Sequence, residues 1–178
     1  MGIRLLTTLV DKVPSVWTQE KSLQNTPVII DGNALMFFLY KQTDCRAGGE
    51  FDKFSRDIEK FFANFAGQNV TPYVVLDGAT VAVDKKLETV IKRTEDKIET
   101  CYNLSKGKSG KSAETKVLSP LAKMTFITKL RSLGIEFTVC DREADQKIAI
   151  LANQKNCPVI SNDRATSLSM IFQKDIYL

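Results

Sequence analysis

The stretch "TPVIIDGNALMFFLYK", Thr26 to Lys41, changes its hydrophobic period in the middle. The run from Val28 to Ile30 is short, apolar and β-branched, which is typical of a buried strand. After Asp31 and Gly32, the apolar residues recur at helical spacing. The sequence therefore predicts a strand, a tight turn and a helix, with an acid at the point where the strand ends.

The same order recurs along the chain. A second buried strand, from Tyr73 to Leu76, again ends in an acid and a glycine, Asp77 and Gly78. Helices are also expected at 51–67, 84–105, 118–134 and 141–156, strands at 135–140, 157–161 and 175–178, and a flexible loop rich in Gly, Ser and Lys at about 105–117. Strands that alternate with helices predict an α/β domain with a mainly parallel central sheet.

Composition narrows the class of protein. At 178 residues and 43% hydrophobic content, the chain is expected to form a single domain, 1–178. It has neither an apolar run of about 18 residues nor a secretory signal pattern, so we expect an intracellular protein without a membrane span. The formal net charge of +4 permits an anionic partner without demonstrating one.

Cysteine and histidine usage narrows the chemistry further. The four cysteines form no C-x-x-C pair and the chain has no histidine, which argues against a structural zinc site and excludes imidazole acid–base chemistry. If the protein is an enzyme, carboxylates and lysines must carry its chemistry.

Acids gather where the predicted strands end. Asp31, Asp77 and Asp163 directly follow strands or lie just beyond them, and Glu143 and Asp145 open the helix after the strand at 135–140. Taken singly, each acid has an ordinary explanation as a turn residue, a helix cap or a helix N-terminal charge. Five acids at one edge of a parallel sheet would, however, repel one another unless cations neutralised them. Carboxylate oxygens suit Mg²⁺ or Mn²⁺, and two such ions about 3.5 to 4 Å apart can hydrolyse a phosphodiester without histidine.

A basic helix follows the second of these acids. Lys86 and Arg93 are seven residues apart, which places them on one helical face, where they can hold a phosphate. A solvated face of i,i+4 pairs is the alternative, and it is favoured for a Lys/Glu-rich helix considered alone. The nearby "GKSGKS" is not a P-loop, because the first glycine of the motif is missing and no strand precedes it.

Several of these segments carry a family resemblance. They are "MGIR", "VIIDGNAL", "PYVVLDG" followed by "DKKLETVIKR", and "EADQKIAILANQKNCPVIS" with Asp163 behind it. Together they resemble the flap endonuclease and xeroderma pigmentosum G superfamily of nucleases, most of all its asteroid-homologue branch. The resemblance covers most of the chain in the right order, and it implies a PIN-like three-layer α/β/α domain.

The resemblance also implies an activity. Members of the superfamily bind two Mg²⁺ or Mn²⁺ ions and hydrolyse DNA near junctions of single and double strands, such as flaps, forks and overhangs. A nuclear location and a role in DNA repair are implied as well, with no small-molecule cofactor. By position, the implied metal ligands are Asp31, Asp77 and Glu143 for the first ion, Asp145 shared between the ions, and Asp163 for the second ion. Lys86 and Arg93 are similar to the superfamily's phosphate-contacting pair, and Gly2 to the residue whose backbone approaches the substrate.

The chain departs from the superfamily pattern at the second metal. Ala165 occupies the place of an acid after Asp163, and the sequence stops at Leu178, before the usual C-terminal helical DNA-binding module. The second ion is therefore expected to bind weakly. Two hypotheses follow. The chain is a metal-dependent structure-specific endonuclease of weakened activity, or it is an inactive PIN-like module that binds nucleic acid or protein.

Overall fold

The computed structural model describes residues 22–44, 49–79, 87–107 and 117–161. Its elements, in order, are β1 (Pro27–Asp31), α3 (Gly32–Tyr40), α4 (Phe51–Gly67), β2 (Thr71–Leu76), α5 (Leu87–Ser105), α6 (Pro120–Ser132), β3 (Glu136–Val139), α7 (Asp145–Lys155) and β4 (Val159–Ile160). Within the described ranges, the type of every predicted element is confirmed. The predicted strand at 175–178 and most of the loop at 105–117 lie outside the described residues.

Several predicted elements are shorter than expected, and for two of them the structure shows why. The helix predicted at 141–156 begins only at Asp145. The residues before it form a bend, in which the carbonyl of Arg142 accepts a hydrogen bond from the N–H of Gly78, just beyond β2. The strand predicted at 157–161 is confined to Val159–Ile160. Pro158 lacks the N–H that a longer ladder would need.

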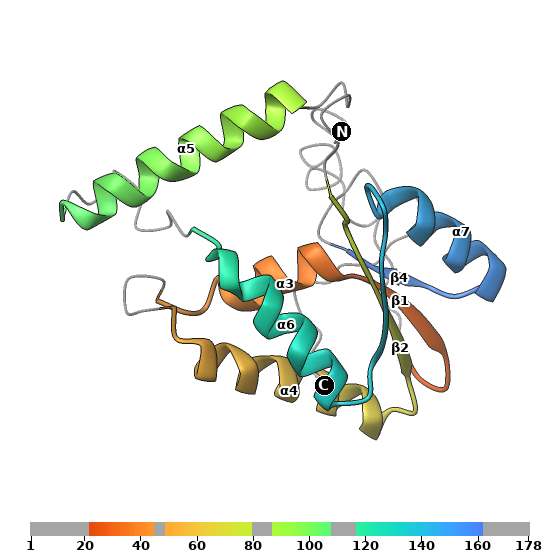
Figure 1. Cartoon of the computed structure of the whole chain (residues 1–178). Helices are drawn as coiled ribbons and strands as arrows, with labels where there is room; N and C mark the ends of the chain where they lie inside the picture. The colour runs from red at the N-terminus through yellow and green to blue at the C-terminus, as the bar shows by residue number, and fades with distance from the viewer. Residues whose placement is uncertain (1–21, 45–48, 80–86, 108–116, 162–178) are drawn as a thin grey trace, which may run out of the picture.

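The strands form one sheet in the order β3-β2-β1-β4, and all neighbours are parallel (Figure 1). In β1, the backbone of Ile30 lies opposite Val74 of β2 on one side and Ile160 of β4 on the other. The predicted parallel sheet is therefore confirmed, and all carboxyl ends of its strands meet at one edge.

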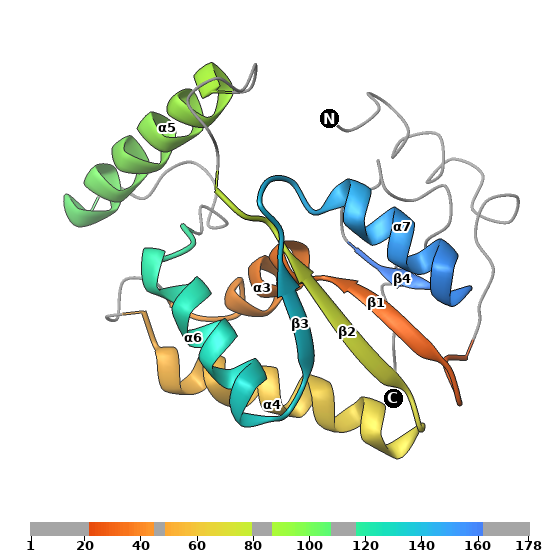
Figure 2. The same ribbon diagram turned by 45° about the vertical axis from the view of Figure 1, so that its right-hand side comes forward.

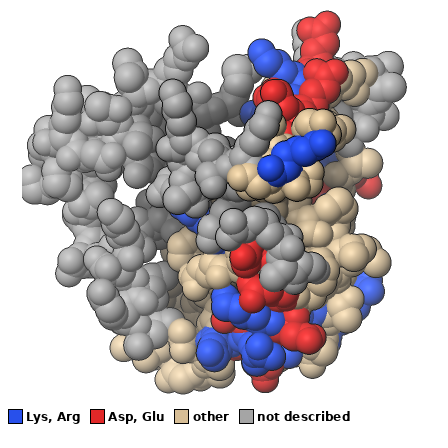
Figure 3. Space-filling view, turned by 90° about the vertical axis from the view of Figure 1, so that its left-hand side faces the viewer, with Lys and Arg blue, Asp and Glu red and all other residues tan. Residues whose placement is uncertain are grey.

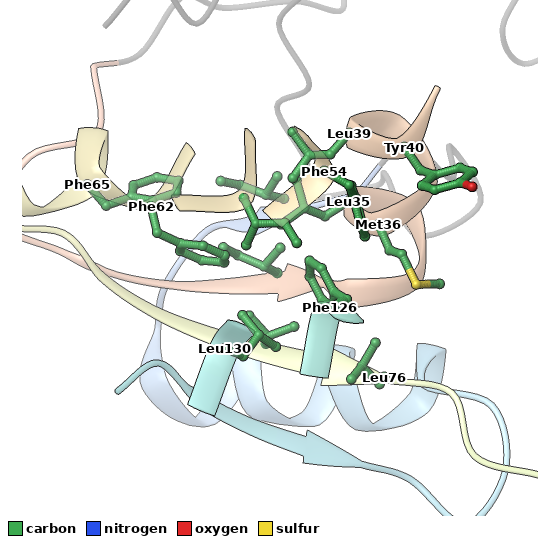
Figure 4. Close-up of a cluster of buried hydrophobic side chains, with 14 of the residues drawn as sticks. Leu35, Met36, Leu39, Tyr40, Phe54, Phe62, Phe65, Leu76, Phe126 and Leu130 are labelled. Carbon is green, nitrogen blue, oxygen red and sulfur yellow. The ribbon is translucent and has the colours of Figure 1, made fainter. Parts of the chain in front are cut away.

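Helices cover both faces of this sheet. One face packs against α3, α4 and α6, and the other against α7 (Figure 2). The alternation along β1 explains the two layers, because Val28 and Ile30 join the larger core while Ile29 joins the core under α7. In the larger core, Phe54 of α4 and Phe126 of α6 are fully buried (Figure 4). The three-layer α/β/α arrangement is confirmed.

The helix α5 is the exception to this packing. It lies apart from the sheet in Figures 1 and 2, and none of its residues is buried. Ile91, Ile98 and Tyr102 on this helix are 48%, 64% and 59% exposed. Among the described residues, no helix is both long enough and apolar enough to cross a bilayer.

Charges on the described surface are mixed. On the face that Figure 3 shows, the coloured acidic and basic side chains are interspersed. One ion pair joins two helices on the same face of the sheet, since the ammonium of Lys129 on α6 lies 2.7 Å from the carboxylate of Glu59 on α4. Such exposed pairs contribute little stability, about 0 to 1 kcal/mol each.

Candidate functional site

Two of the predicted acids meet at the carboxyl edge of the sheet. Asp31 is the last residue of β1 and lies opposite Val75 of β2, and Asp77 is the first residue beyond β2. The two carboxylates are close enough for the charge of Asp77 to raise the pKa of Asp31. The structure thus brings together two acids that are 46 residues apart in the sequence, as the strand pattern predicted.

Asp31 is fixed by contacts from two other elements. It is only 8% exposed and caps α3, because its Oδ1 accepts a hydrogen bond from the backbone N–H of Ala34 at 3.0 Å. Its Oδ2 accepts a hydrogen bond from the Ser161 hydroxyl, which directly follows β4, at 2.7 Å. One carboxylate therefore serves both as a helix cap and as an acid of the candidate site.

Burial raises the pKa of Asp31 above its ordinary value, and the charge of Asp77 raises it further. The hydrogen bonds from Ala34, Ser161 and Asn33 lower it but do not cancel the effect of burial. Ionisation of the Asp31 carboxyl group is therefore unfavourable in the folded protein. A cation bound beside it would stabilise the ionised form.

Replacing Asp31 with Asn is expected to stabilise the metal-free protein at neutral pH. Because its folded-state pKa is raised, the folded protein binds more protons than the unfolded chain at pH values above about 4, so stability is lost as pH rises through that window. Asn is an equally good cap and does not ionise. Thermal unfolding in a chelator should show a midpoint that falls less with pH in Asp31→Asn than in the wild type. Equal pH dependence would contradict the buried-charge explanation.

Asp77 is held at three points. Its Oδ1 accepts a hydrogen bond from the backbone N–H of Ala144 at 2.7 Å, and its Oδ2 accepts one from the side-chain amide of Asn33. Its main-chain carbonyl accepts a hydrogen bond from the ammonium of Lys123 at 2.7 Å. These donors come from α3, from α6 and from the start of α7, so the position of Asp77 depends on the whole sheet edge.

The residue after Asp77 makes a close backbone crossing. The N–H of Gly78 donates to the carbonyl of Arg142 at 2.7 Å, and a Cβ at this glycine would lie 1.7 Å from the main-chain oxygen of Cys140. Only glycine fits there. This close contact holds the segment before α7 next to Asp77. The N–H of Ala144 in that segment can therefore donate its hydrogen bond to the Asp77 carboxylate.

The other predicted site residues have different outcomes. Glu143 and Asp145 are exposed and flank Ala144, the residue whose N–H binds Asp77. Arg93 is exposed on α5. Gly2, Lys86 and Asp163 lie outside the described residues, as does Ala165. In the described part of the chain, no three acids or cysteines are grouped closely enough to hold a metal ion. The five-acid metal site therefore stays a prediction.

Sequence reasoning missed three residues at this edge: Asn33, Lys123 and Ser161. Each supplies a hydrogen-bond donor to Asp31 or Asp77. The signal for Asn33 was present, since it is a polar residue in the first turn of the helix directly after Asp31. Nothing in the pattern of α6 singles out Lys123 among its basic residues.

The oxygen chemistry at this edge fits Mg²⁺ or Mn²⁺. Asp31 and Asp77 offer carboxylate oxygens, and the side-chain oxygen of Asn33 is buried with no hydrogen-bond partner among the described residues. This oxygen belongs to the side chain whose nitrogen binds Asp77, and a hard cation or one of its waters could supply the partner that it lacks.

The fold places the chain in a known class. Two solved complexes of the catalytic core of Rad2 with DNA substrate resemble it, with TM-scores of 0.62 and 0.54 at 16% and 12% sequence identity. They cover 98% and 88% of this chain, which corresponds to 53% and 43% of the solved chains. The described fold is therefore that of a PIN-like nuclease core.

The sequence comparison gives the nearer relationship. No protein-family model matches the chain. It is 39% identical over 165 residues to the human protein named Single-strand DNA endonuclease ASTE1, and 34% identical over 167 residues to the Drosophila melanogaster Protein asteroid. Each alignment covers 92% of this chain. The chain is thus a homologue of the asteroid proteins, as its motifs predicted. It spans 24% of the length of the human relative and 19% of the fly relative.

Proposed function

We propose that the protein is a metal-dependent, structure-specific DNA endonuclease that hydrolyses phosphodiester bonds near junctions of single and double strands. The observation that carries the proposal is the meeting of Asp31 and Asp77 at the carboxyl edge of a parallel sheet, next to the segment with Glu143 and Asp145. The human, mouse and zebrafish relatives are each named Single-strand DNA endonuclease ASTE1, and these names support the proposal.

Mg²⁺ or Mn²⁺, when bound, would activate water and stabilise the leaving oxygen of the phosphodiester. Asp31, Asp77, Glu143, Asp145 and Asp163 would hold the two ions, the second of them weakly. The protein's own contribution is to hold the first two acids in place. Ser161 and the N–H of Ala34 fix both oxygens of Asp31, while Asn33 and the N–H of Ala144 fix those of Asp77. Acids held in this way need little reorganisation when a cation arrives.

The substrate phosphate is proposed to lie against the basic residues after Asp77. Lys86 and Arg93 would contact it through their side chains and Gly2 through its backbone. Because such contacts release counterions from DNA, binding should weaken with increasing salt. Flaps, forks and overhangs are the proposed DNA structures, and a nuclear location with a role in DNA repair belongs to the same proposal.

A non-catalytic module is the second candidate. Two observations favour it: no three acids are grouped in the described part of the chain, and both carboxylate oxygens of Asp77 already have protein donors. In this case the PIN-like domain would bind nucleic acid or a protein partner without cleaving anything.

The first experiment measures cleavage of end-labelled flap, fork, overhang and single-stranded DNA in Mg²⁺ or Mn²⁺, with and without EDTA. We expect cleavage that EDTA abolishes and that excess Mn²⁺ restores, because the acids alone cannot activate water. Cleavage that persists in EDTA would point to a contaminating or metal-independent activity. If the folded protein binds DNA and cleaves none of it in either metal, the non-catalytic module becomes the function.

A further inference from the structure

Asn33 owes its position to the glycine before it. A Cβ on Gly32 would lie 2.6 Å from the side chain of Leu76 and 2.7 Å from that of Val74, both of which are fully buried in β2. Without a side chain at this position, the first turn of α3 lies directly against β2. Asn33 in that turn therefore reaches across to Asp77, at the end of the neighbouring strand.

The two polar atoms of the Asn33 amide have different surroundings. The nitrogen donates a hydrogen bond to the carboxylate of Asp77. This assignment follows from chemistry, because an amide oxygen in its place would repel the carboxylate. The oxygen then points elsewhere, and it is buried without a hydrogen-bond partner among the residues that the structure describes.

Most buried polar atoms in proteins have a hydrogen-bond partner. We therefore expect the Asn33 oxygen to have a partner as well. The two nearby carboxylates, Asp31 and Asp77, cannot supply it, since ionised carboxylates only accept hydrogen bonds. A hard divalent cation, or a water bound to one, supplies what is missing, because amide oxygens are normal ligands of such ions and normal acceptors for their waters.

We propose that Asn33 is part of the cation site at this edge: its nitrogen orients Asp77, and its oxygen binds the divalent cation or one of the waters on it. This inference rests on the proposed function, since it requires the sheet edge to bind metal. It adds a neutral residue with two roles to a site for which the sequence indicated carboxylates alone.

The test is Mn²⁺ binding, measured by calorimetry on the metal-free full chain, together with the thermal midpoint of each protein in a chelator. Asn33→Ala removes both roles and should weaken Mn²⁺ binding about 10- to 100-fold, the range typical for residues that support metal ligands. Its metal-free midpoint should change little, because the substitution removes a buried unpaired oxygen as well as the donor to Asp77. Asn153→Ala on the exposed side of α7 is the matched control and should bind Mn²⁺ as the wild type does.

Asn33→Asp separates the cation role from a structural one. It keeps an oxygen but loses the donor to Asp77 and adds a like charge, so it should lower the metal-free midpoint while binding Mn²⁺ at least as well as Asn33→Ala. If Asn33 had a purely structural role, Asn33→Asp would lower the stability of the protein and would bind Mn²⁺ less well than Asn33→Ala.

The outcomes distinguish the inference from the function on which it rests. Wild-type affinity in Asn33→Ala would overturn the role of Asn33 and leave the metal site standing. Absence of Mn²⁺ binding by the wild type itself would overturn both. If Asn33→Ala fails to fold, Asn33→Asp decides, and loss of all Mn²⁺ binding in that folded variant would count against the oxygen as a ligand.

Discussion

Asp77→Asn is expected to abolish tight divalent-cation binding and DNA cleavage while the fold remains intact. The substitution keeps the shape of the side chain, so one oxygen still accepts the N–H of Ala144. It removes the charge that a cation needs, and it places an amide nitrogen against the nitrogen of Asn33. Because Asp77 would be a direct ligand, we expect a loss greater than the roughly 10- to 100-fold that outer residues of metal sites typically cost.

Calorimetry with Mn²⁺ and cleavage of end-labelled flap DNA measure the two effects on one preparation. The matched control is Glu136→Gln, because Glu136 is an exposed acid at the amino end of β3, on the opposite edge of the sheet. It should bind Mn²⁺ and cleave DNA as the wild type does. Wild-type Mn²⁺ affinity in Asp77→Asn would place the metal elsewhere in the chain.

The same variant also tests whether the two acids are coupled. The charge of Asp77 raises the pKa of Asp31, after burial, which has the larger effect. Removing that charge should therefore lower the pKa of Asp31 towards its ordinary value without restoring it fully. The two carboxylates form a pair that is costly without a cation, and this cost is the physical reason to expect that metal binding stabilises the fold.

Much of this arrangement could be predicted from the sequence, for reasons that are local. Two short apolar runs, Val28 to Ile30 and Tyr73 to Leu76, are typical of strands, and each is followed by an acid and a glycine. Because a parallel sheet collects its carboxyl ends at one edge, the pairing of Asp31 with Asp77 followed from the order of elements alone.

The contacts that hold Asp77 could not be predicted in the same way. Asn33 lies 44 residues before it and Lys123 lies 46 residues after it, so both hydrogen bonds depend on how helices settle on the sheet. No local period encodes that packing. The start of α7 was misplaced for a similar reason, because the residues before it are shaped by the contact between Gly78 and Arg142.

That contact is the basis of the largest expected loss of stability, in Gly78→Ala. The added Cβ would lie 1.7 Å from the main-chain oxygen of Cys140 and 2.7 Å from the carbonyl carbon of Asp141. These are backbone atoms, which cannot swing aside as the end of a side chain can. Overpacking ordinarily costs about 1 to 3 kcal/mol, and a clash with backbone should reach or exceed the upper end of that range.

Urea unfolding followed by circular dichroism measures this loss through the transition midpoint. Gly67→Ala is the matched control, because a Cβ at the end of α4 would meet nothing within 4 Å. Since Ala favours helix over Gly by about 0.8 to 1 kcal/mol, the control should be neutral or more stable than the wild type. The two glycine substitutions should therefore shift the midpoint in opposite directions. A free energy of unfolding for Gly78→Ala within about 1 kcal/mol of the wild-type value would contradict this explanation. The segment before α7 would then not lie against Asp77 in solution, and the N–H of Ala144 would not explain how that carboxylate is held.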